Sequence, residues 1–483
     1  MASNPGDELP TQRLSAIDRQ STTQIAALPD LPTTPEAAVT ELPTHKLAAT
    51  APVSQRRAPI WRRAIPDPRR PYGRLVYALF AFLLLVSLSI PLLRQLAFAQ
   101  HPLGSHPGAT TVATGGHGTG GASSPSLSWL NTAASDAETR YVNKLIAHMT
   151  LDEEIGQMIM VEFTESQVTP GIAYEISHYH VGSVILYSYN ILNATQTTQL
   201  DHDLQANSTI PLMISTDQEG GRVNRLQNVD GYFPPAAQIG AKNDPSYAEQ
   251  RGSEDAKNLY ALGINANMAP VVDVENVPGG SFLGDRIFGS TPDQVTKMAD
   301  AYLSGLQHSQ HVVGCIKHFP GLGDVSVDPH AQLPTLTRSL SDLQQIDWAP
   351  YASLIATGQV RMVMVTHETV PAVDPTLPSS LSKPMITGVL RDQLHFNGVI
   401  VTDGIYMKSL AAHYSFDQIV LLAVEAGEDI ISSTYSLDST AEAESVIRDA
   451  VTNGTITKQR IDDSVRRILL LKLHYGMLPA PSH

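Results

Sequence analysis

The sequence predicts an α/β protein whose folded part is a (β/α)8 barrel of the TIM type. Three observations carry this prediction. Eight short apolar runs recur after residue 135, helix-like segments separate most of them, and no G-x-G-x-x-G pattern follows the first run. Apolar strands that alternate with helices are typical of a parallel sheet covered on both faces. Eight repeats favour a closed barrel, and the missing glycine pattern weakens the case for an open dinucleotide-binding sheet.

The expected strands are dominated by β-branched and other apolar residues. They comprise residues 157–163, 184–186, 212–215, 268–271, 314–318, 362–366, 399–402 and 429–432. Three of the intervening segments, 292–311, 342–357 and 415–427, have the length and the apolar spacing of helices. Together these elements define one catalytic domain over residues 136–478.

The N-terminal part of the chain has a different composition. Residues 1–74 are rich in Pro, Thr, Ala and Ser without an apolar period, so we expect them to be disordered. Residues 75–93 are almost wholly apolar and would span roughly 28 Å as a helix, which predicts a single transmembrane signal anchor. A cleaved signal peptide is the alternative, because residues 97–99 read Ala-Phe-Ala. Residues 94–135 are expected to form a Gly/Ser-rich flexible linker.

The distribution of charge predicts the membrane topology of the chain and argues against nucleic acid as a partner. Seven arginines lie between Arg56 and Arg74, directly before the apolar run, which predicts a cytoplasmic N-terminus and an extracytoplasmic catalytic domain. The net charge is −15, and the excess of acidic residues lies after residue 100. An acidic globular part argues against nucleic acid as a partner. Cys315 is the only cysteine of the sequence, so an intrachain disulfide is impossible.

Polar residues follow several of the expected strands at the point where each ends. Asp217 follows the third, Lys317 and His318 end the fifth, His367 follows the sixth, and Asp403 follows the seventh. A single acid after a strand is often only a helix N-cap. In a barrel, however, the carboxyl ends of all strands meet at one face, where catalytic residues gather. The set suits general acid–base chemistry on a polyhydroxylated ligand.

Four motifs carry a family resemblance. They are residues 217–225 (DQEGGRVNR), 286–290 (RIFGS), 317–324 (KHFPGLGD) with 328–330 (DPH), and 398–403 (GVIVTD). The sequence from about residue 136 to 476 resembles the β-N-acetylhexosaminidase branch of family 3 glycoside hydrolases. Leu322 stands where many members have histidine, and Pro329 stands where serine is usual. Neither departure removes a catalytic group, although Pro329 restricts the backbone of its loop.

The resemblance implies a role for each matching residue. Asp403 takes the position of the nucleophile, which forms a covalent glycosyl-enzyme. His330 takes the position of the acid/base, oriented by Asp328. Five further positions would bind the sugar: Asp217, Arg225, Arg286, Lys317 and His318. No metal ion or other cofactor is implied.

The expected function is that of a retaining exo-β-N-acetylglucosaminidase, which removes terminal β-linked GlcNAc from peptidoglycan fragments or chito-oligosaccharides. Three alternatives stay open: a β-glucosidase or β-xylosidase of the same fold, a β-N-acetylglucosaminide phosphorylase, and a catalytically inactive cell-wall binding protein. The loop of residues 328–330 disfavours the first alternative, and the presence of both Asp403 and His330 disfavours the third. The oligomeric state is left open.

Overall fold

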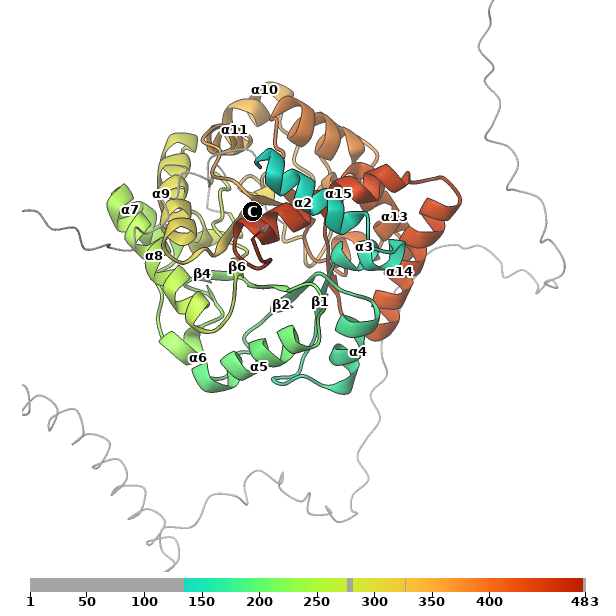
Figure 1. Ribbon diagram of the computed structural model, residues 1–483. Coiled ribbons are helices and arrows are strands. Elements are labelled where there is room, and N and C mark those ends of the chain that lie inside the picture. The colour runs from blue at the N-terminus through green and yellow to red at the C-terminus, as the bar shows by residue number, and fades with distance from the viewer. Residues whose placement is uncertain (1–133, 276–280, 326, 481–483) are drawn as a thin grey trace, which may run out of the picture. The chain divides into compact units, whose positions relative to one another are not determined.

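A computed structural model describes residues 134–275, 281–325 and 327–480. These residues form an α/β fold in which eight parallel strands make a nearly closed, barrel-like sheet surrounded by helices (Figure 1). The order around the sheet is β10-β1-β2-β3-β6-β7-β8-β9. The strand bounds are β1 Ile159–Glu162, β2 Ser183–Leu186, β3 Met213–Thr216, β6 Ala266–Asn267, β7 Val313–Phe319, β8 Met362–Val365, β9 Val399–Thr402 and β10 Ile431–Thr434.

The two ends of the sheet approach each other between β9 and β10. Val401 pairs with Ile430 in a parallel bridge, and the Thr402 amide donates to the Ile430 carbonyl over 3.0 Å. All seven residues of β7 are buried, as are all residues of β2, β3, β8, β9 and β10. Burial of both strand faces explains why these segments read as continuous apolar runs rather than alternating ones.

Helices follow most of the strands. The longer ones are α2 Asp136–Ile146, α3 Leu151–Gln157, α4 Pro170–His178, α5 Ala194–Ala206, α7 Ala236–Lys242, α8 Pro245–Ala261, α9 Pro292–Gln310, α11 Ala349–Ala356, α13 Phe416–Ala426, α14 Leu437–Thr452 and α15 Lys458–His474. The remaining elements are α6 Gln227–Asp230, α10 Leu340–Asp342, α12 Lys408–Ala411, η3 Gly284–Arg286, η4 Leu343–Asp347, η5 Ser379–Leu381 and the ten-residue π-helix η6 Pro384–Gln393, together with a small hairpin of β4 Gln218–Gly220 and β5 Val223–Asn224. Several helices begin at a side-chain cap, such as Thr291 before α9 and Ser415 before α13.

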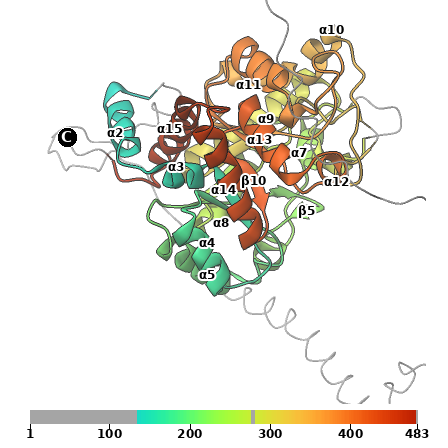
Figure 2. The same cartoon turned by 90° about the vertical axis from the view of Figure 1, so that its right-hand side faces the viewer.

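The two ends of the barrel differ. Figure 2 shows α2 and α15 at one end and β5 and α12 at the other. Lys472 of α15 donates to the Gly182 carbonyl over 2.8 Å, directly before β2 begins, so α15 packs against the amino-terminal ends of the strands. The loops after the strands are therefore free to build a site at the carboxyl ends, where barrels of this kind carry their chemistry.

Seven of the expected strands overlap the observed ones, and the exception has a physical reason. Regular pairing in the fourth strand is limited to Ala266–Asn267, not the expected 268–271. Pro270 has no N–H to donate, and Val271 makes only a single bridge, to Lys317. The helix expected over 342–357 is also interrupted: a π turn, η4, precedes α11, whose second residue is Pro350. Proline is tolerated in the first helical turn and disrupts a helix interior.

The N-terminal predictions lie almost wholly outside the described residues. This applies to the disordered region 1–74, to the apolar run 75–93 and to the linker 94–135 as far as residue 133. No helix of the described part has both the length and the apolar character that a membrane span requires. The first helix of the described part, α2, is capped by Ser135 together with Glu138.

Candidate active site

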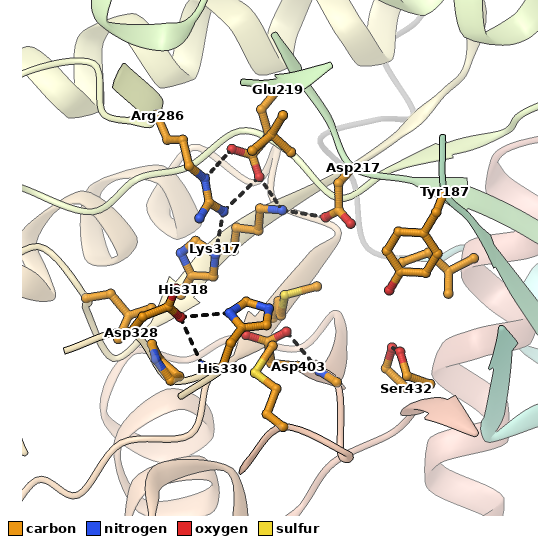
Figure 3. Close-up of a pocket in the computed structure, with 18 of the residues that line it drawn as sticks. Tyr187, Asp217, Glu219, Arg286, Lys317, His318, Asp328, His330, Asp403 and Ser432 are labelled. Atoms are coloured by element: carbon orange, nitrogen blue, oxygen red, sulfur yellow. Dashed lines mark hydrogen bonds and ion pairs between the residues drawn. The ribbon is translucent and has the colours of Figure 1, made fainter. Parts of the chain in front are cut away.

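A pocket of about 190 Å³ lies at the carboxyl ends of the strands. All eight residues that the sequence selected line it, although their positions along the chain span almost 190 residues. These residues are Asp217, Arg225, Arg286, Lys317, His318, Asp328, His330 and Asp403, and Figure 3 labels all of them except Arg225. The pocket is also lined by Glu219, Tyr187, Ser432 and Ser433. The barrel therefore brings loops after five different strands to one cavity.

A buried lysine lies at the centre of the polar network. The Lys317 ammonium, on β7, lies 2.6 Å from Asp217 Oδ1 and 2.7 Å from Glu219 Oε1. Burial by itself would lower the pKa of Lys317, but the two carboxylates outweigh it and raise the pKa. Arg286 binds Glu219 with two nitrogens, Nε at 2.7 Å and Nη2 at 2.9 Å. Burial opposes ionisation of Glu219, yet Lys317 and Arg286 hold the pKa of this carboxyl far below its usual range.

His318 connects this network to a second carboxylate. Its Nδ1 lies 2.7 Å from Asp273 Oδ2, and its Nε2 lies 3.1 Å from Arg286 Nη2. Because a guanidinium can only donate, Nε2 accepts and Nδ1 carries the proton that Asp273 accepts. The other oxygen of Asp273 accepts from the Leu322 amide over 2.7 Å. The imidazole is thus fixed in orientation and tautomer, and the loop after β7 is held at Leu322.

Asp403 immediately follows β9 and points into the pocket (Figure 3). Its amide donates to the Val365 carbonyl over 2.8 Å, and its Oδ1 accepts from the Gly404 amide over 2.8 Å. Burial would raise the pKa of Asp403, but His367, His318 and the Gly404 amide together lower it. The lowered pKa favours the ionised carboxylate.

His367 holds the loop that carries Asp403. Its Nε2 lies 2.9 Å from the Gly404 carbonyl, and its Nδ1 lies 2.7 Å from Ser380 Oγ. Burial lowers the pKa of His367, which favours the neutral ring. In the neutral ring Nε2 donates to the carbonyl, and Nδ1 accepts from the serine hydroxyl.

Asp328 and His330 lie in the loop after β7. Asp328 Oδ1 lies 2.8 Å from His330 Nδ1 and accepts from the His330 amide over 2.9 Å. Burial would raise the pKa of Asp328, but its hydrogen bonds to His330 and the His330 charge lower it. The His330 side chain is 70% exposed, so a proton can reach it from solvent. Pro329 between them accepts from the Ser409 amide over 3.3 Å, which ties this loop to α12.

Arg225 takes a more peripheral place in the site. Its Nη2 lies 3.9 Å from Asp217 Oδ2, and its guanidinium lies over the Tyr187 ring at 5.4 Å. The contact with Asp217 is at the limit for an ion pair. Arg225 therefore keeps hydrogen-bonding capacity that a ligand can use. In the ranges that the structure describes, no group of three or more His, Cys, Asp or Glu side chains is arranged to hold a metal ion.

Several polar residues of the site had no role assigned from the sequence, among them Glu219, His367, Asp273 and Tyr187. Glu219 and His367 carried a signal: Glu219 stands two residues after Asp217, and His367 follows the expected sixth strand, but neither was assigned a role. Asp273 lies two residues after the expected fourth strand. Only the folded barrel shows that it faces the same pocket region as the polar residues after the other strands. Tyr187 follows β2 directly, but tyrosine after a strand is too common to select.

The comparison with known proteins agrees with this geometry. Residues 150–471 match the domain described as glycosyl hydrolase family 3 N terminal domain. The chain is 30% identical to beta-hexosaminidase A of Pseudoalteromonas piscicida over 366 residues, which is 67% of this chain and 61% of that protein.

Two solved structures have a similar fold. A glycoside hydrolase family 3 beta-N-acetylglucosaminidase from Paenibacillus sp. str. FPU-7 gives a TM-score of 0.66 at 35% identity, covering 69% of this chain and 64% of that one. The beta-glucoside phosphorylase BglX gives a TM-score of 0.63 at 26% identity, covering 71% of this chain and 61% of that one. The chain thus spans less than two thirds of these three proteins. The domain match covers well over half of the chain, so the chain belongs to glycosyl hydrolase family 3.

Proposed function

We propose that this chain is a retaining exo-β-N-acetylglucosaminidase, which hydrolyses terminal β-linked GlcNAc from peptidoglycan fragments or chito-oligosaccharides. One observation supports it above the others. An ionised carboxylate, Asp403, and a histidine hydrogen-bonded to a carboxylate, His330 with Asp328, line the same pocket. The remaining lining groups are donors and acceptors suited to sugar hydroxyl and carbonyl oxygens. The names of the Pseudoalteromonas and Paenibacillus relatives support the N-acetylglucosamine preference.

The first step forms a covalent intermediate. A carboxylate oxygen of Asp403 attacks the anomeric carbon, the bond from that carbon to the glycosidic oxygen breaks, and protonated His330 gives its proton to the departing oxygen. His330 acts through Nε2, because Nδ1 faces Asp328. The Asp328 carboxylate stabilises the imidazolium and holds the ring in place, as the acid of a triad does.

The second step releases the sugar. Neutral His330 removes a proton from water, the water oxygen attacks the anomeric carbon, and the bond to Asp403 breaks. The two inversions give net retention of the β-configuration. Lys317, Arg286 and His318 hold the sugar through both steps, with Asp217 accepting from its hydroxyls. Their orientation is fixed by the Glu219 and Asp273 contacts before substrate arrives, which reduces the cost of ordering the site.

The cellular setting belongs to the same proposal. Residues 75–93 would anchor the protein as a single-pass segment with residues 1–74 in the cytoplasm and the barrel outside, and residues 94–135 would tether the barrel. This rests on the apolar run and on the arginines before it. A topology test is protease treatment of intact spheroplasts, which should degrade or release the barrel while a tag on residues 1–20 stays protected and membrane-bound.

A second candidate is phosphorolysis, in which phosphate replaces water in the second step. Similarity to the beta-glucoside phosphorylase BglX favours it, and a histidine acid/base does not repel phosphate as a carboxylate would. One panel separates the candidates: nitrophenyl β-glycosides of GlcNAc, glucose and xylose, each with and without phosphate. Free GlcNAc as the main product supports the proposed function. Sugar 1-phosphate would favour the phosphorylase, and equal turnover of the glucoside would favour a β-glucosidase.

A further inference from the structure

The side chain of Asn267 pairs with the backbone of Gln218, the residue between Asp217 and Glu219. Its Oδ1 accepts from the Gln218 amide over 3.0 Å, and its Nδ2 donates to the Gln218 carbonyl over 2.9 Å. The ladder between β3 and β6 ends at the pair of Thr216 and Asn267, so Gln218 lies beyond it. A side-chain amide carries both a donor and an acceptor, and here it takes the place of the missing strand.

This pairing holds the direction of two carboxylates of the pocket. Successive side chains of an extended segment point to opposite sides, so Asp217 and Glu219 share a side and Gln218 faces the other. Asp217 and Glu219 both contact the Lys317 ammonium, at 2.6 Å and 2.7 Å (Figure 3). The side chain of Gln218 instead accepts from the Leu226 amide over 3.1 Å. A rotation of the Gln218 backbone would therefore change the direction of both carboxylates relative to Lys317.

Two helices behind this loop hold Asn267 in turn. Asp255 of α8 accepts at Oδ2 from Asn267 Nδ2 over 2.8 Å and from the Tyr302 hydroxyl of α9 over 2.6 Å. Asn267 and Asp255 are fully buried and Tyr302 is 2% exposed, so bulk solvent does not compete for these bonds. Tyr302 also lines a small cavity of about 10 Å³ together with Glu219 and Arg286. We call Asn267, Asp255 and Tyr302 the clamp.

The contact with Asp255 decides which way the Asn267 amide points. Both protons of Nδ2 are used, one for the Gln218 carbonyl and one for Asp255. Without Asp255, the amide group loses the contact that favours this orientation over the one turned by 180°. The turned amide would set Nδ2 against the Gln218 N–H, and two donors cannot bond to each other.

We propose that the clamp residues are positioning residues for the cleaved sugar, which hold Asp217 and Glu219 in the direction that places the Lys317 ammonium. This inference rests on the proposed function, in which Asp217 and Lys317 bind the sugar. A site that is ordered before the sugar arrives loses less entropy on binding. None of the three clamp residues lines the pocket, so replacing them removes no contact with the sugar. A loss of sugar affinity in their variants therefore reports positioning.

The test measures the Kd of N-acetylglucosamine, a product of the proposed reaction, by titration calorimetry. In Asn267→Ala we expect this Kd to rise about tenfold, and kcat/KM on a nitrophenyl GlcNAc glycoside to fall by a similar factor. The loss should lie in KM, with kcat within about threefold of the wild type, because sugar binding is weakened while Asp403 and His330 stay in place.

Two changes at Asp255 separate its hydrogen bonds from its contribution to packing. Burial raises the pKa of Asp255 to about 8, so the neutral acid prevails at pH 7, and asparagine matches it in size and charge. Asp255→Asn should therefore keep the wild-type Kd, whereas Asp255→Ala should raise it about three- to tenfold. The matched control is Leu259→Ala, one turn later on α8 and fully buried. It destabilises the same helix and should leave the Kd unchanged below its unfolding transition.

The outcomes separate the clamp from the function on which it rests. A wild-type Kd in folded Asn267→Ala, or in Asp255→Ala should the first variant not fold, would overturn the clamp and leave the proposed function standing. A loss of affinity in Leu259→Ala as large as that in Asp255→Ala would also overturn it, because loosening of α8 alone would then explain the effect. If the wild type neither bound N-acetylglucosamine nor hydrolysed its glycosides, the proposed function would fall, and this inference with it.

Discussion

The ammonium of Lys317 lies 2.6 Å from the carboxylate of Asp217, although 100 residues separate the two along the chain. Lys317 is 2% exposed and also contacts Glu219 at 2.7 Å, so one buried cation faces two carboxylates. Removing one partner from a buried ion pair is costly, because the remaining charge stays desolvated. Under the proposed function, this contact would link the stability of the barrel to its ability to bind a sugar.

Replacing Lys317 tests that link. In Lys317→Met we expect the free energy of unfolding to fall by about 3 kcal/mol and kcat/KM on a nitrophenyl GlcNAc glycoside to fall at least 100-fold. The fall in stability follows because Asp217 loses its 2.6 Å partner and Glu219 keeps only Arg286. The fall in kcat/KM follows from the loss of a proposed sugar contact. Urea unfolding and steady-state kinetics measure the two. Lys297→Met is the matched control, because Lys297 is an exposed lysine on α9. Unchanged stability in Lys317→Met would show that the contacts of Lys317 with Asp217 and Glu219 make no net contribution to the free energy of unfolding.

His330 is tested by its dependence on the leaving group. A departing nitrophenolate leaves without protonation, whereas a sugar alkoxide needs a proton. His330→Ala should therefore slow N,N′-diacetylchitobiose about 10²- to 10⁴-fold, and slow the first step with a dinitrophenyl glycoside far less. Asp328→Asn should show the same pattern, more weakly. If both substrates slowed equally, His330 would only position the sugar.

The acid side of the pH profile reports on Asp403. Its pKa is lowered, so the ionised, active form is present above that pKa and is lost only as the pH falls through it. We expect kcat/KM for the dinitrophenyl glycoside, which needs the nucleophile but little acid help, to stay constant down to about pH 5, above the ordinary aspartate range. The control is full recovery of activity after return to neutral pH. A fall in kcat/KM centred above pH 5, with activity fully recovered at neutral pH, would contradict this account of Asp403.

Lys472 predicts a pH dependence of stability at the opposite end of the barrel. It is buried and donates to Gln157 and to the Gly182 carbonyl, and burial lowers its pKa to about 7. The unfolded chain, with a lysine pKa of about 10.4, binds more protons between these two values. Stability should therefore rise with pH across this range, by about 1 kcal/mol per unit relative to Lys472→Met. Urea unfolding of both proteins at pH 7.5 and 9 measures it. A constant difference would show that Lys472 is charged in the fold.

The sequence predicted the barrel and most of the site because both leave local signals. Strands buried on both faces, such as β9, read as apolar runs, and Asp217, Lys317 and Asp403 stand where those runs end. The resemblance then assigned roles that residue types alone left open. Asp273 could not be found this way. Its importance depends on its contacts with His318 and the Leu322 amide, which only the folded barrel brings together.

The central claim is that Asp403 forms a covalent bond to the sugar, and trapping that bond tests it most directly. The protein would be incubated with a slow fluorosugar substrate based on GlcNAc, digested, and analysed by peptide mass spectrometry. Asp403→Asn, which keeps the size of the side chain, is the control and should remain unlabelled. The account predicts one added glycosyl mass on the peptide that contains Asp403, with fragmentation placing it on that residue. A glycosyl mass on another residue, or complete inhibition without any adduct, would contradict the assignment.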